Sequence, residues 1–126
     1  MKPCKFDKLV ADTLHSCESV MTSKEEEYSS GKDRFHNFKV AARMKGCTPI
    51  EALEGMKLKH DVSVKDLIDN PDTATERLLT DKIGDSINYL LLLKGLLIEH
   101  MEKKQINPHI QTNFKNLPFS RGADNG

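Results

Sequence analysis

One apolar stretch in the second half of the chain constrains the fold more than any other part. It runs from Asp81 to Glu99 with the sequence DKIGDSINYLLLLKGLLIE. Apolar residues recur there at intervals of three and four, from Leu79 to Met101, and only Lys94 interrupts the pattern. The spacing predicts a long helix at the centre of the protein. Its apolar run from Leu90 to Ile98 is broken by Lys94 and is far shorter than the ~20 apolar residues that cross a bilayer, so no membrane partner is expected.

The same stretch carries two carboxylates near its start, Asp81 and Asp85. Residues four apart lie on one face of a helix, about one turn from each other. One interpretation is a metal site on a core helix. The other is a pair of solvated carboxylates that interact favourably with the positive end of the helix dipole. The spacing alone does not choose between them.

Length and charge limit the classes of protein to consider. The chain has 126 residues, enough for one domain with a real core. It has 19 basic and 19 acidic residues and no net charge, which gives no signal for nucleic acid or an anionic membrane. Its cysteines are Cys4, Cys17 and Cys47, without zinc-finger or paired spacing. We expect free thiols in a cytoplasmic protein.

Helix-start signals and turn residues divide the chain into segments. Thr48, Pro49 and Glu51 form a capping-box pattern, and the spacings Ser63–Asp66 and Thr73–Glu76 repeat it. The expected helices cover residues 6–28, 33–45, 49–60, 63–68 and 73–104, with the 63–68 segment only a short piece. No segment alternates with a period of two, so no sheet is predicted.

These segments predict an all-α protein resembling a four-helix bundle. We expect one helical domain over residues 1–104 and a polar C-terminal tail over residues 105–126. The four consecutive leucines from Leu90 to Leu93 cannot all face one partner helix. A second chain is therefore expected against part of this helix, which predicts a homo-oligomer, either a dimer or a larger assembly.

Two blocks of sequence carry a resemblance to a known group. The first is SKEEEY, residues 23–28, followed by DRFHNF, residues 33–38; the second is DKIGDSINY, residues 81–89, preceded by Lys59 and His60. Together they resemble small phage and prophage proteins of the nucleotide-modification-associated type. They are also similar to the all-α nucleotide pyrophosphohydrolases, the MazG-like and dimeric-dUTPase-like group. The resemblance covers roughly residues 5–103.

The resemblance implies an enzyme of the bacterial host cytoplasm that holds Mg²⁺ between two helices. It implies hydrolysis of the α–β phosphoanhydride of a nucleoside triphosphate, with catalytic residues Glu27, Asp81 and Asp85. The implied metal ligands are these three and Glu26. The first acidic pair departs from the family pattern, because Ser23 and Lys24 stand where a glutamate is expected. Two alternatives therefore stay open: a non-catalytic oligomer that captures a nucleotide, such as a signalling nucleotide, or a structural or interaction protein.

Other polar and aromatic groups near the two blocks are candidates for nucleotide contacts. The cations are candidates for phosphate binding or for ordinary surface ion pairs: Lys24, Arg34, Lys59, His60 and Lys82. The mid-helix residues Asn37 and Asn88 either read a base or sugar edge or tie helices together. The rings of Tyr28, Phe35, Phe38 and Tyr89 either stack on a base or belong to the core.

Overall fold

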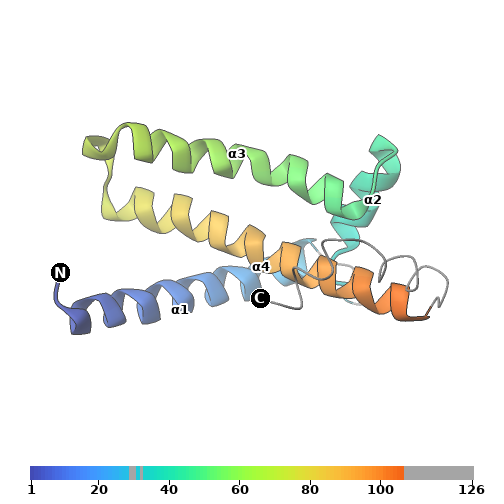
Figure 1. Ribbon diagram of the computed structural model, residues 1–126, viewed down its shortest axis with the longest axis horizontal. Coiled ribbons are helices and arrows are strands. Elements are labelled where there is room, and N and C mark those ends of the chain that lie inside the picture. Colours follow the sequence, from blue (N-terminus) through green and yellow to red (C-terminus); the bar gives the residue numbers. More distant parts are fainter. Residues whose placement is uncertain (29–30, 32, 107–126) are drawn as a thin grey trace, which may run out of the picture. The chain divides into compact units, whose positions relative to one another are not determined.

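The computed structural model of the protein describes residues 1–28, 31 and 33–106, without the side chains of residues 25–28 and 106 (Figure 1). Its α-helices are α1 (Pro3–Tyr28), α2 (His36–Lys45), α3 (Pro49–Asp69) and α4 (Glu76–Ile106), and a short 3₁₀ helix, η1 (Pro71–Thr73), precedes α4. The described residues contain no strand, which confirms the all-α prediction. Apart from Gln105 and Ile106, which belong to α4, the predicted tail lies outside the described residues.

The chain divides into two compact units, residues 1–93 and 94–126. The first contains α1, α2, α3, η1 and the first turns of α4, and both cavities discussed below lie within it. In the second unit, Lys103 and Glu99 form an ion pair of 3.2 Å along the last turns of α4.

Local signals set the boundary between α2 and α3. Gly46 ends α2 with a φ of 69°, a left-handed conformation that glycine adopts without steric cost. Thr48 then begins α3 with a complete capping box: its side chain accepts from the Glu51 N–H, and the Glu51 carboxylate accepts from the Thr48 N–H, both at 3.1 Å. These starts and stops confirm the sequence prediction.

The predicted break near Ser63 is wrong, because α3 continues without interruption to Asp69. The Ser63 hydroxyl donates to the carbonyl of Lys59 at 3.0 Å, four residues back in the same helix. That bond is the one a serine makes inside a helix and not the one it makes as a cap. Residues 49–60 and 63–68 are therefore parts of one helix.

The start of α4 also differs from the prediction by a few residues. Pro71–Thr73 forms the 3₁₀ turn, and the hydroxyl of Thr75, not that of Thr73, accepts from the Leu78 N–H at 3.2 Å. Thr73 instead donates its hydroxyl hydrogen to the Asn70 carbonyl. The capping role passes to the threonine that lies next to the helix.

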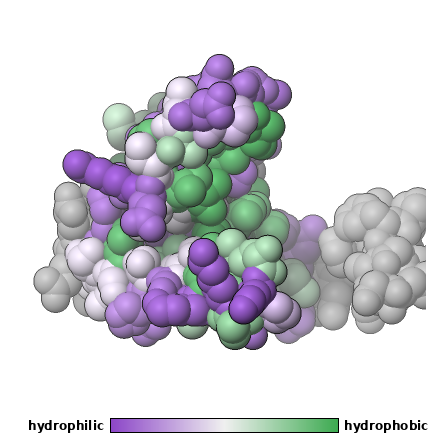
Figure 2. All heavy atoms as spheres, turned by 90° about the vertical axis from the view of Figure 1, so that its left-hand side faces the viewer, coloured by the Kyte–Doolittle hydropathy of each residue, from purple (hydrophilic) through white to green (hydrophobic). Residues whose placement is uncertain are grey.

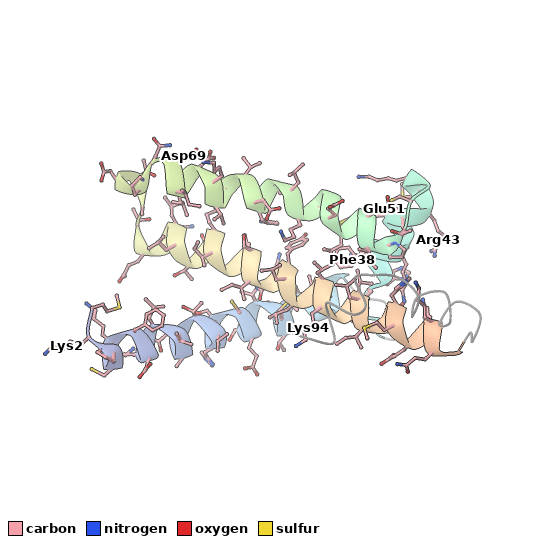
Figure 3. All side chains as sticks on the ribbon, in the orientation of Figure 1. Lys2, Phe38, Arg43, Glu51, Asp69 and Lys94 are labelled. Atoms are coloured by element: carbon pink, nitrogen blue, oxygen red, sulfur yellow. The ribbon has the colours of Figure 1, made fainter. Side chains whose placement is uncertain are left out.

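Within the first unit, α3 runs antiparallel to the first part of α4, whereas α1 runs in the same direction as α4 (Figure 1). α2 packs against α3, and its Phe38 points toward α4 (Figure 3). Among the described residues of this unit, few apolar side chains are buried: Cys17, Phe38, Ala42, Ala52, Leu53 and Leu92.

Many large apolar side chains of the first unit stay exposed. They lie on α1, α3 and α4, and apolar residues gather between polar margins on the side where α1 begins and α3 ends (Figure 2). No helix among the described residues combines the length and apolar character needed to span a bilayer.

Candidate functional site

A cavity of about 500 Å³ lies between α1, the turn before α2, α2, α3 and α4. We call it cavity 1; its volume is within the range of pockets that hold small ligands. The described residues that line it are Val20, Met21, Lys24, Arg34, Asn37, Phe38, Gly55, Met56, Lys59, His60, Asp85, Asn88, Tyr89 and Leu92. Residues from both sequence blocks therefore meet at one place.

Cations from three different parts of the chain line this cavity. Lys24 comes from α1, Arg34 from the turn before α2, and Lys59 from α3. Arg34 reaches back to α1, where its Nη2 lies 4.0 Å from the Sδ of Met21. Among the described lining residues Asp85 supplies the one carboxylate, so fixed positive charge exceeds negative charge.

The turn that carries Arg34 is held by its neighbour Asp33. The Asp33 carboxylate accepts from the Phe35 N–H at 2.9 Å and from the Lys39 ammonium at 2.7 Å. The bond from Lys39 is the main reason that the pKa of Asp33 lies below its ordinary value. Asp33 thus fixes the entry into α2 and does not line the cavity.

An aromatic wall forms one side of cavity 1. The ring of Tyr89 lies 4.6 Å from that of His60, tilted by 37°, and meets the ring of Phe38 edge-on at 6.5 Å. Three helices contribute these rings, so the wall depends on the packing of α2, α3 and α4. Flat apolar surfaces of this kind suit a planar ligand group.

His60 also lies next to Asp85 at the edge of the cavity, with 3.6 Å between Nδ1 and Oδ2. Burial lowers the pKa of His60, the Asp85 carboxylate raises it, and the charges of Lys59 and Lys82 lower it further. The net shift is downward, so the imidazole is neutral at pH 7. Lys82 therefore acts on the site through its charge, although it does not line the cavity.

Asn88 is the buried polar group of the site. It is 6% exposed, and its Oδ1 has no hydrogen-bond partner among the described residues. An orphaned buried carbonyl oxygen is costly, and such atoms in proteins usually serve a ligand or an ordered water. Asn88 borders cavity 1 and also a second cavity.

This second cavity, cavity 2, has a volume of about 730 Å³ and lies between α1 and the first turns of α4. Asp81 and Asp85 both line it, and Asp85 and Asn88 connect it with cavity 1. Asp81 is more exposed than Asp85, and its Oδ2 lies 3.9 Å from the Nε of Arg77 on the surface of α4.

The predicted acidic cluster is thus placed only in part. The side chains of Glu26 and Glu27 lie outside the described residues. Within the described part of the chain, no three His, Cys, Asp or Glu side chains are grouped closely enough to hold a metal ion. The structure instead gathers Lys24, Arg34, Asn37, His60, Asp85 and Asn88 around cavity 1.

Sequence reasoning did not assign the apolar floor of the cavity to the site. Val20, Met21, Met56 and Leu92 all line it, together with Gly55. Each fits an ordinary helical core pattern, so nothing in the spacing separates a cavity wall from a packed interior. Gly55 has no side chain, and a Cβ at its position would meet no neighbouring atom within 4 Å, which helps to leave this space open.

Comparison of this chain with models of protein families, with curated proteins and with solved structures found no match.

Proposed function

We propose that the protein binds a nucleotide in cavity 1 and does so without needing a divalent cation. The observation that carries this proposal is the combination of two fixed cations, Arg34 and Lys59, with the partnerless Oδ1 of buried Asn88 around one cavity. A nucleotide offers anionic phosphates to the first and hydrogen-bond donors to the second.

The cations suit the phosphates for a physical reason. Neither Arg34 nor Lys59 has a carboxylate within ion-pair distance among the described residues, so a ligand does not have to displace an internal partner. A guanidinium binds phosphate oxygens in a two-pronged geometry, and a lysine adds a point charge. Lys82 adds further positive potential, as its effect on His60 indicates.

The remaining groups suit a base. The wall of Tyr89, His60 and Phe38 offers an apolar surface to a planar ring. The Oδ1 of Asn88 accepts a hydrogen bond from an amino or imino group on the base edge or from a sugar hydroxyl. Binding would then satisfy an atom that is left without a partner in the free protein.

The test is calorimetry with ATP, GTP, CTP and UTP, each in excess EDTA, with the parent and three single variants. Arg34→Gln and Lys59→Gln should each weaken binding by roughly 10- to 100-fold, since a hydrogen bond to a charged group contributes about 1.5–3 kcal/mol. Lys65→Gln is the matched control, because Lys65 lies on α3 and pairs with Asp69 at 2.6 Å, away from the cavity. Absence of binding by all four nucleotides, or an equal effect of the control, would refute the proposal.

Mg²⁺-dependent hydrolysis of the α–β phosphoanhydride is the second candidate. It is supported by Asp81 and Asp85, which lie one turn apart and line cavity 2, and by Asp85 also lining cavity 1 with the cations. Mg²⁺ commonly takes only one or two carboxylates and completes its shell with water and substrate phosphates, so these two side chains fit it. The ion would supply charge neutralisation at the phosphates. Asp81 and Asp85 would hold it, while Arg34 and Lys59 would orient the phosphate chain.

Asp85→Asn separates the two candidates. For capture alone, removing a like charge beside the phosphates should strengthen binding in EDTA. For hydrolysis, the same variant should abolish pyrophosphate release in Mg²⁺, whereas Asp7→Asn on the exposed start of α1 should not. No pyrophosphate from the parent with any of the four triphosphates would remove the hydrolysis candidate.

We also propose that the protein functions as a homo-oligomer in the cytoplasm of a bacterial host, as part of phage nucleotide metabolism. The oligomer is supported by the exposed leucines on α4, Leu90 and Leu91, which are 53% and 48% exposed. The phage setting is supported by the resemblance of the two sequence blocks. Light scattering of the purified protein tests the first part of this proposal.

A further inference from the structure

α1 carries a ladder of apolar side chains that nothing in the described structure covers. Phe6, Val10 and Leu14 follow each other at intervals of four and are 54%, 39% and 56% exposed. On α4, Leu90 and Leu91 are exposed to a similar degree, with the partly exposed Ile87 one turn before them and Ile83 two turns before them. We call these seven residues the α1–α4 face.

Leu14 on α1 and Ile87 on α4 lie on the same side of the helix pair. α1 meets α4 where the Sγ of Cys17 lies 3.8 Å from the carbonyl oxygen of Gly84. At ~100° per residue, Leu14 is turned about 60° from Cys17, and Ile87 is turned about 60° from Gly84 in the opposite sense. Because α1 and α4 run in the same direction (Figure 1), opposite turns bring both side chains to one side of the pair. By the same count Val20 and Asn88, which line both cavities, lie on the other side, although Ile83 also lines cavity 2.

The size of the face matches what a stable dimer needs. Five half-exposed and two partly exposed large side chains leave on the order of 500 Å² of apolar surface uncovered. One side of a standard interface buries about 800 Å², and about 65% of a homodimer interface is apolar, which gives the same value. An exposed apolar surface of this size is near the upper end of what a monomer leaves uncovered, and such surfaces often mark an interaction site.

We propose that a second copy of this chain covers the α1–α4 face, with the same face of both copies in contact around a twofold axis. A self-complementary apolar patch satisfies the symmetry of such a dimer, since each ladder meets an identical one. α1 and α4 of the two copies would then form a four-helix layer, with cavity 1 of each copy on the outer side. The inference builds on the proposed homo-oligomer and does not depend on the ligand.

The experiment is multi-angle light scattering of the full chain under reducing conditions, because all three cysteines are free thiols. The parent should have twice the 14.2 kDa chain mass at micromolar concentration. Leu14→Glu and Leu90→Glu should each weaken dimerisation at least tenfold. Leu58→Glu is the matched control: Leu58 is 60% exposed, but it lies on α3 outside the face, and its substitution should leave the dimer intact.

Circular dichroism shows whether Leu14→Glu and Leu90→Glu are still folded, so that a loss of the dimer is not mistaken for unfolding. Both variants change side chains that are already half exposed, and both should retain the helical signal of the parent. A parent of single-chain mass would overturn the homo-oligomer and this inference together. An oligomeric parent that Leu58→Glu dissociates, while Leu14→Glu and Leu90→Glu do not, would overturn this inference alone and place the interface on α3.

Discussion

Replacing Asn88 with leucine should stabilise the free protein and weaken its ligand binding. Asn88 is 6% exposed and its Oδ1 lacks a partner among the described residues, so folding removes this oxygen from water without compensation. An unsatisfied buried acceptor costs about 1–3 kcal/mol. Leucine has a similar shape, has no polar atom and is the better helix former by a few tenths of a kcal/mol. We expect Asn88→Leu to raise the free energy of unfolding by about 1–3 kcal/mol.

Urea denaturation followed by circular dichroism measures this change. The midpoint should rise with an unchanged slope, because the surface exposed on unfolding stays nearly the same. The melting temperature should rise by roughly 4 °C per kcal/mol for a chain of this length. Nucleotide affinity should fall at least tenfold in calorimetry, since the acceptor for the base or sugar is gone.

Asn88→Asp is the matched comparison, because it keeps the shape and adds a charge. A buried carboxylate three residues from Asp85 should destabilise the protein by several kcal/mol at pH 7, and by less at pH 4. The reasoning is refuted if Asn88→Leu lowers the free energy of unfolding by about 1 kcal/mol or more. That result would mean that Asn88 makes a structural hydrogen bond in the free protein.

Further predictions concern the pH dependence of stability, two glycines and the N-cap of α3. The pKa of His60 lies below its ordinary value of 6.5 because of burial, so the unfolded chain binds more protons as the pH falls below 6.5. The parent should lose stability from pH 6.5 down to the folded pKa, and His60→Phe should lose less in urea titrations across that range. Gly84→Ala should stabilise α4 by about 0.5–1 kcal/mol, since the added Cβ meets only the Sγ of Cys17 at 4.0 Å. Gly46→Ala should instead destabilise by about 1 kcal/mol, because its φ is 69°. Thr48→Ala removes half of the capping box and should cost about 1 kcal/mol, with thermal melts as the readout; a neutral effect would contradict the assigned cap.

Local signals predicted the helices well where one short pattern decided the outcome. Thr48 caps α3 as its spacing to Glu51 indicates, because both bonds lie within four residues. The similar pattern at Ser63 failed, since a serine hydroxyl is also satisfied by the carbonyl four residues back in a continuing helix. The sequence around Ser63 permits both arrangements, and the continuation of α3 to Asp69 settles the choice.

Single residues of the site could be predicted from their type and position in the sequence. The full set of residues that surrounds the cavity was harder to predict. Asn88 stood out because asparagine is a poor helix former in an apolar stretch, and the structure places it at the junction of two cavities. The balance of charge around cavity 1 was not predictable, because Arg34 and Lys59 come together through the packing of separate elements. Asp81 and Asp85 have the same spacing signal, yet only Asp85 reaches both cavities, because cavity 1 borders α4 from Asp85 to Leu92 and Asp81 lies one turn before that part of the helix.

Asp85 and His60 also couple the charge of a ligand to proton binding. With Nδ1 and Oδ2 3.6 Å apart, the pair becomes an ion pair only when the imidazole is protonated, and burial opposes that in the free protein. A polyphosphate that arrives without a metal adds negative potential beside His60, which raises its pKa, so binding takes up a proton. A divalent cation at Asp85 has the opposite effect, because it neutralises the carboxylate that favours the charged imidazole. Calorimetry in two buffers of different ionisation enthalpy should therefore reveal proton uptake for capture in EDTA. It should reveal less uptake, or proton release, if Mg²⁺ enters with the nucleotide.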